Sequence, residues 1–162
     1  MGVAVTGAGV AVALRARGQR ARWVGWQRLA AARGLQAAEG DPLGVGPVLS
    51  GSGRPRTVQR TLSGTVDGIP VAVVVAVSLT SVRWEVRARS DVFGLASVGA
   101  PVPVDRIRSA LRDVPGISIG AVGDLAVVEP QRGLRLAVDL PPPEEAAGLL
   151  DLAVRAGRAA LG

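Results

Sequence analysis

The segment from residue 58 to residue 79 constrains the fold most, because it holds two runs of strand-forming residues separated by Asp67-Gly68. Aspartate followed by glycine suits a type I′ turn, in which both central residues need positive φ. In the first run Val58, Leu62 and Val66 alternate with polar residues, which predicts one dry and one wet face. The segment therefore predicts a β-hairpin whose first strand is an outer strand of a sheet.

The second run, Val71 to Leu79, is apolar at nearly every position and predicts a central strand covered on both faces. A turn is expected at Thr80-Ser81. Beyond it, the apolar residues from Val82 to Ala88 alternate with charged residues, which predicts a half-exposed third strand. Its arginines, Arg83, Arg87 and Arg89, are interpreted as a solvated ladder on one face. The three runs together predict an antiparallel meander.

Helical periodicity predicts three helices around these strands. The first covers residues 20–34, with Trp23 and Trp26 packed against the sheet and Gly34 at its end. The second begins at Asp105 as its cap and ends at Pro115-Gly116. The third follows Pro143, with two glutamates at its start and two arginines near its end, an arrangement that suits the helix dipole.

Short β runs at 117–122, 125–129 and 134–140 lie between the second and third helices. Residues 36–56, rich in glycine and proline, predict a long loop, and residues 94–103 predict a joint. The sequence thus predicts an α+β fold with antiparallel sheet and flanking helices in the order α-βββ-α-βββ-α. We expect residues 20–162 to form one domain behind an N-terminal arm at 1–19.

The net charge of +6 is confined to the first 33 residues. These residues hold six arginines and no acid, whereas the rest of the chain holds 13 arginines against 13 acids. The uncharged, mostly apolar residues 2–14 directly precede the first basic cluster, which is Arg15, Arg17, Arg20 and Arg22. The folded body is therefore expected to be electroneutral, and the arm carries the charge.

An apolar run followed by a basic flank is typical of a membrane anchor with its body on the cytoplasmic side. The run is shorter than the roughly 20 residues that span a bilayer. Four interpretations stay open: a truncated or marginal anchor, an arm resting on anionic lipid head groups, an arm that binds nucleic acid phosphates, or a strand or helix of the core. The anchor interpretation favours a membrane surface as the partner of residues 2–22. The residues expected to contact this surface are Arg15, Arg17, Arg20 and Arg22. A soluble cytoplasmic protein is the alternative.

Catalysis has few residue types to draw on, because the chain contains no His, Cys, Lys or Tyr. Zinc sites, thiolate chemistry, Schiff-base lysines and Ser-His-Asp triads all need one of these residues. Carboxylate chemistry remains, but the 13 acids show no clustered pattern. We therefore expect a noncatalytic binding or structural module without cofactor or metal, with a carboxylate-only enzyme as a further alternative.

Two strings carry a resemblance to a known group. They are Trp26-x-x-Leu29-Ala30-x-x-x-Gly34-Leu35 and Leu62-Ser63-Gly64-x-x-x-Gly68-x-Pro70-Val71. Over residues 23–80 the chain resembles uncharacterised bacterial proteins that have an N-terminal membrane segment and a small α+β domain. The resemblance implies membrane attachment and no particular activity.

Overall fold

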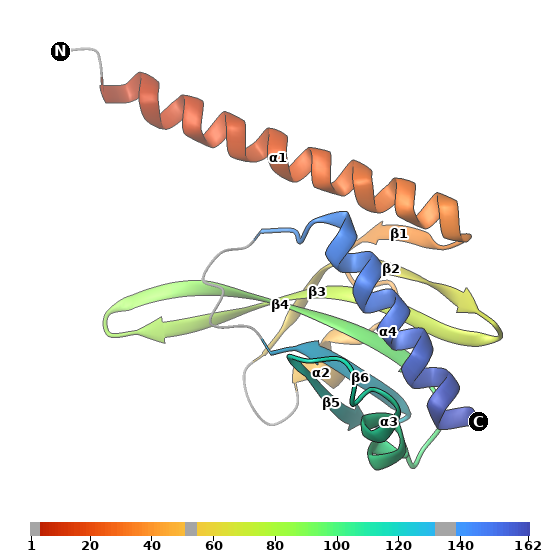
Figure 1. The fold of residues 1–162 in the computed structure, drawn as a ribbon. Helices are drawn as coiled ribbons and strands as arrows, with labels where there is room; N and C mark the ends of the chain where they lie inside the picture. Colours follow the sequence, from red (N-terminus) through yellow and green to blue (C-terminus); the bar gives the residue numbers. More distant parts are fainter. Residues whose placement is uncertain (1–3, 51–54, 132–138) are drawn as a thin grey trace.

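A single six-stranded antiparallel sheet forms the centre of the molecule (Figure 1). The computed structural model describes residues 4–50, 55–131 and 139–162. In spatial order the strands are β1, β2, β3, β4, β6 and β5. The elements along the chain are α1 (Ala4–Arg33), β1 (Gln36–Glu39), α2 (Gly46–Ser50), β2 (Thr57–Val66), β3 (Ile69–Val82), β4 (Glu85–Ser97), α3 (Val104–Ala110), β5 (Ile117–Val122), β6 (Leu125–Pro130) and α4 (Pro143–Leu161). The predicted α+β class with flanking helices is confirmed.

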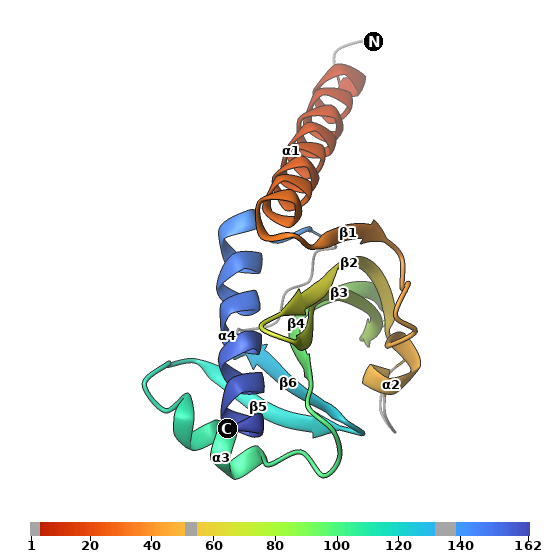
Figure 2. The same ribbon diagram turned by 90° about the vertical axis from the view of Figure 1, so that its right-hand side faces the viewer.

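The two faces of the sheet are covered unequally. Helix α4 lies along one face, and the short helix α2 lies on the other (Figure 2). The main core is built between α4 and the sheet, with Leu150, Ala153, Val73 and Val128 fully or almost fully buried. A smaller apolar cluster lies under α2, around Phe93. The face that carries α4 is called the helical face below, and the other is called the α2 face.

Small residues let α4 approach the sheet closely. A Cβ atom on Gly94 of β4 would lie 2.9 Å from the backbone oxygen of Leu149, and one on Gly157 would lie 2.8 Å from the side chain of Ile69. Alanines and glycines on α4 therefore set the distance between helix and sheet, while its leucines fill the space beside them. This explains why a core with one phenylalanine and no tyrosine can be dense.

The predicted hairpin at Asp67-Gly68 is confirmed. Asp67 and Gly68 have φ of 52° and 78°, as a turn with two left-handed residues requires. Val66 pairs with Ile69 across the turn. The side chain of Asp67 also forms an ion pair with Arg158 of α4, which ties the hairpin to the end of that helix.

Two elements lie in the stretch predicted as a loop at 36–56. Strand β1 pairs with β2, so β2 is an inner strand and the prediction of an outer strand is wrong. The sequence of β1, QAAE, has no strand pattern of its own, and its pairing partner places it. Helix α2 is held by Asp41, whose carboxylate accepts hydrogen bonds from the backbone N–H groups of Val45 and Gly46 at 2.9 and 2.8 Å.

The predicted dry face of β2 is also wrong, because the strand contains a register shift between Val58 and Arg60. Val58 packs into the α2-face cluster, whereas Leu62 packs into the main core. A bulge inserts one extra residue and so reverses the alternation beyond it. Thr61, expected to be wet, is fully buried and donates a hydrogen bond from Oγ1 to the Gly40 oxygen at 2.9 Å.

The turn between β3 and β4 lies at Arg83-Trp84, three residues beyond the predicted position at Thr80-Ser81. Both strands are consequently longer than expected, and β4 continues through the first residues of the predicted joint at 94–103. The antiparallel meander of β2, β3 and β4 is confirmed, with β3 as a central strand. Arg87 and Arg89 share one face, but Arg83 lies in the turn and is not part of their ladder.

The second half of the chain contains α3, β5, β6 and α4. The helix near 105 is confirmed as α3, but it ends at Ala110 and not at Pro115-Gly116. Its N-cap is Pro103, and Asp105 forms an ion pair with Arg108 in place of capping. The runs at 117–122 and 125–129 are confirmed as β5 and β6, and the last helix as α4. The strand predicted at 134–140 falls on residues that lie largely outside the described part of the chain.

The helix predicted at 20–34 is confirmed but is longer, since α1 begins at Ala4 and runs without interruption to Arg33. Trp26 is fully buried, as expected, and Trp23 is half-buried beneath the guanidinium of Arg60, which lies 4.8 Å from its ring centre. The first residues of this helix extend beyond the body of the molecule (Figure 1).

Gly94→Ala should lower the free energy of unfolding by about 2 kcal/mol, because the added methyl group meets the α4 backbone at 2.9 Å and forces helix and sheet apart. Gly120→Ala is the matched control, since it also lies within a strand but its Cβ would meet no atom within 4 Å. Urea denaturation of both variants measures the difference. Equal stability of the two would contradict the close approach described here.

Candidate functional site

The C-terminal half of α1 is fixed to the body by one buried side chain. Trp26 has no exposed surface, and its Nε1 donates a hydrogen bond to the backbone oxygen of Pro141 at 2.9 Å. Ala30, one turn later, is buried against the same core. Because an indole buries on the order of 200 Å² and its N–H needs a partner, this contact sets both the position and the rotation of α1.

The inner face of α1 continues this contact towards the N-terminus with polar side chains. Arg15 forms an ion pair with Asp139 at 2.9 Å. Gln19 accepts a hydrogen bond from the Leu140 N–H at 2.7 Å, and Arg22 donates one to the Leu140 oxygen at 2.7 Å. Positions 15, 19, 22 and 26 lie on one face of a helix. Two of the four arginines predicted to contact lipid, Arg15 and Arg22, therefore bind the protein itself.

Arg17 and Arg20 differ from these two. Both are exposed, and neither forms an ion pair or a side-chain hydrogen bond with any residue that the structure describes. At about 100° per residue they lie on the side of α1 opposite Trp26, together with Arg28. The sequence analysis did not identify Gln19 and Asp139 as residues that hold α1 on the body. The helical spacing of positions 15, 19, 22 and 26 is the signal that would have distinguished Arg15 and Arg22 from Arg17 and Arg20.

The helix beyond these arginines projects away from the body (Figures 1 and 2). Residues 4–14 form this projecting segment, and no acidic or basic residue occurs in it. Leu14 is 61% exposed at its inner end. Within the described residues, no helix is both long and apolar enough to cross a membrane.

The α2 face holds a groove of about 530 Å³ beside α2. Leu43, Val48, Leu95 and Leu125 contribute apolar wall, while Ser63, Thr65, Ser97 and Asp124 contribute polar groups. Small hydroxyl side chains and one carboxylate in a mostly apolar groove are typical of binding surfaces. A smaller hollow of about 180 Å³ is lined by Leu49 of α2 together with Arg56, Phe93 and Glu129.

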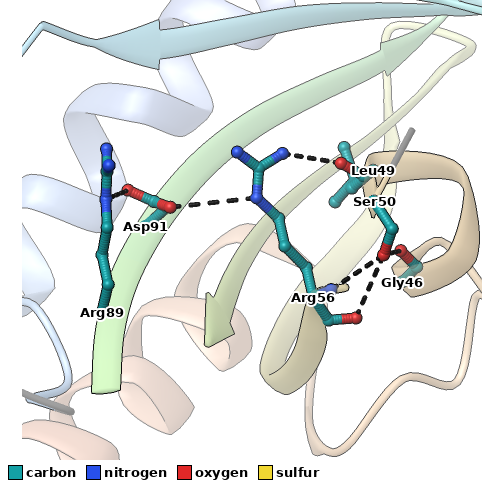
Figure 3. Close-up of polar contacts among 6 residues, drawn as sticks. All are labelled: Gly46, Leu49, Ser50, Arg56, Arg89 and Asp91. Atoms are coloured by element: carbon teal, nitrogen blue, oxygen red, sulfur yellow. Dashed lines mark hydrogen bonds and ion pairs between the residues drawn. The ribbon is translucent and has the colours of Figure 1, made fainter. Parts of the chain in front are cut away.

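Arg56, which lines the smaller hollow, belongs to a cluster of polar and charged contacts with Arg89 and Asp91 (Figure 3). The Arg56 guanidinium lies 5.0 Å from the centre of the Phe93 ring and donates a hydrogen bond to the Leu49 oxygen at 2.6 Å. Asp91 accepts from Arg89 at 3.1 Å and lies 3.9 Å from the Nε of Arg56. This cluster links β2, β4 and the end of α2, because the Arg56 N–H also donates to Ser50 Oγ at 2.8 Å.

Glu129 of β6 belongs to the same cluster. Burial raises the pKa of its carboxyl, and the negative charge of Asp91 raises it further, while Arg56 and Arg89 act against this. Two carboxylates near one hollow are what a carboxylate-only enzyme would need. Both acids are flanked by arginines, and in the described part of the chain no three acids gather in a way that could hold a metal ion.

Glu129→Gln should change the pH dependence of stability. Because the pKa of Glu129 is raised on folding, the folded state binds this proton more tightly, so stability from this group increases as pH falls through the raised value. Glutamine does not ionise, so the variant avoids the cost of burying a carboxylate at neutral pH. The free energy of unfolding of the variant minus that of wild type should thus be larger at neutral pH than at about pH 4. Glu144→Gln, which removes an exposed acid, is the control. Parallel pH profiles for Glu129→Gln and wild type in thermal unfolding would contradict the raised pKa.

Comparison with known proteins returns no match: no family model, no curated protein and no solved structure corresponds to this chain. Two surfaces of the structure stand out: the exposed side of α1 with its projecting segment, and the α2 face with its groove and charged cluster.

Proposed function

We propose that this chain is a noncatalytic module held at an anionic membrane surface by α1, with its α+β body on the cytoplasmic side. The observation that carries the proposal is the state of Arg17 and Arg20. They are exposed, have no partner among the described residues, and directly follow the uncharged segment that projects from the body. Arginines beside an apolar segment extend to lipid head groups while their stems stay on apolar surface.

The docked half of α1 makes this attachment directional. Trp26 and the contacts of Arg15, Gln19 and Arg22 fix the helix on the body, so the projecting segment has a defined direction. At about 1.5 Å per residue, residues 4–14 extend about 16 Å, roughly half of a hydrocarbon core. The segment is therefore suited to insertion into one leaflet, with Arg17 and Arg20 at its head groups.

The nucleic acid alternative uses the same arginines. Phosphate binding would also neutralise Arg17 and Arg20 and would weaken steeply with salt. It gives no role to the apolar residues 4–14, whereas a membrane interface accounts for both the apolar segment and the adjacent charge. Lipid is for this reason the preferred partner, and the positive flank favours a body on the cytoplasmic side.

Replacing both arginines, Arg17→Gln with Arg20→Gln, should weaken binding to vesicles of mixed phosphatidylglycerol and phosphatidylcholine by about 30-fold. The estimate takes about 1 kcal/mol for each basic residue near an anionic surface. Arg28→Gln is the matched control, because Arg28 is exposed on the same side of α1 but lies about two turns closer to the body. Sedimentation with vesicles measures the affinities.

Equal binding of the double variant and wild type, or equal binding to pure phosphatidylcholine vesicles, would contradict a role for these charges at lipid. A protein that ignores vesicles but binds duplex DNA or RNA through Arg17 and Arg20, with a steep salt dependence, would establish the nucleic acid alternative instead.

A further inference from the structure

Strands β3 and β4 continue beyond the rest of the sheet as a two-stranded ribbon. The pairing of β2 with β3 begins at Val77, and that of β6 with β4 ends at Gly94. Residues 78–82 and 85–89 thus pair only with each other within the described chain, over a length of about 16 Å. The ribbon projects from the same side of the molecule as the N-terminal segment of α1 (Figure 1).

The end of this ribbon exposes large apolar side chains. Trp84 in the turn is 100% exposed, and Leu79 and Val86 are 67% and 69% exposed. Leu79 pairs with Ala88 and Val86 with Ser81, which places both on the helical face of the ribbon. On the other face Ser78 and Thr80 are buried. The exposed large apolar side chains that the structure describes on this ribbon therefore lie in the turn and on the helical face.

The residues of this turn, Arg83 and Trp84, do not favour the conformation that the turn adopts. Arg83 has a φ of 57°, a left-handed conformation that bulky side chains disfavour. The hairpin between β2 and β3 meets the same need with Asp67-Gly68, and the hairpin between β5 and β6 has Gly123 at a φ of 59°. A two-stranded ribbon with one open face also gains little stability. Neither hairpin geometry nor the core accounts for an exposed tryptophan preceded by a left-handed arginine.

We propose that this tip, defined as Leu79, Arg83, Trp84 and Val86, is a second contact with an anionic membrane surface. The inference rests on the function proposed for α1 and adds a partner contact from a distant part of the chain. Tryptophan prefers the membrane interface, where its ring is apolar and its N–H reaches water or head groups. Arg83 is exposed and has no partner among described residues, whereas Glu85 is engaged by Arg87 at 2.7 Å. The free charge at the tip is thus positive, which suits anionic lipid.

Tryptophan fluorescence with brominated lipids tests this contact on the full chain. Trp84 is the fully exposed indole, whereas Trp26 is buried and Trp23 is half-buried, so the difference between wild type and Trp84→Phe isolates its signal. Vesicles of phosphatidylglycerol and phosphatidylcholine with brominated acyl chains should quench this difference signal. The signal should stay unchanged with pure phosphatidylcholine vesicles of the same bromination.

Binding of variants gives the second measurement. Burial of about a third of a tryptophan surface is worth about tenfold in affinity, so Trp84→Ala should weaken vesicle binding by about that factor. Leu161→Ala is the matched apolar control, because Leu161 is 60% exposed at the C-terminal end of α4, on the opposite side of the molecule (Figure 1). Arg83→Gln should weaken binding by about fivefold, and Arg112→Gln, an exposed arginine of the α3–β5 connection, should leave it unchanged.

The outcomes separate the two proposals. Vesicle binding that depends on Arg17 and Arg20, with Trp84 left unquenched, overturns the tip contact and leaves the function of α1 intact. Quenching of Trp84 in a protein whose binding is insensitive to Arg17 and Arg20 supports the tip and overturns the role of α1. Absence of vesicle binding by the wild-type protein overturns both.

Discussion

The buried contact between Trp26 and Pro141 is the constraint on which the arrangement of the rest depends. It holds the C-terminal half of a 30-residue helix against the start of α4 and sets the rotation of that helix. Once this rotation is set, the arginines of α1 divide into two groups. Arg15 and Arg22 turn inward to the body, whereas Arg17 and Arg20 turn outward. A basic segment that looks uniform in the sequence thus has one structural face and one free face.

The same contact gives the molecule a direction. The docked half of α1 is rigidly placed, and its N-terminal segment and the ribbon of β3 and β4 project from one side of the body (Figure 1). Both projections combine apolar residues with arginines that have no partner in the described chain, Arg17 and Arg20 on α1 and Arg83 on the ribbon. The groove on the α2 face belongs to the body and is built by other elements. The groove and the two projections are therefore separate surfaces.

Several elements could be read from local sequence because local chemistry dictates them. Asp67-Gly68 favours a two-residue hairpin turn, and the amphipathic pattern of α4, with acids at its start and an arginine in its last turn, is typical of a helix that packs one face on a core. Other elements could not be read locally. Strand β1 exists because β2 offers it a pairing edge, and the bulge near Gln59 moves Val58 to the opposite face from Leu62. In both cases a distant partner decides the conformation, and propensity contributes little.

Residue types and their periodicity were enough to establish the α+β class, the central hairpin and the confinement of net charge to the first 33 residues. Only the tertiary structure decided which arginines are free, because that depends on the rotation of α1 imposed by Trp26. Only the tertiary structure revealed the exposed tip at Trp84 as well. The local sequence predicted the turn three residues too early, and the ends of β2 and β6 leave the last residues of β3 and the first residues of β4 paired only with each other.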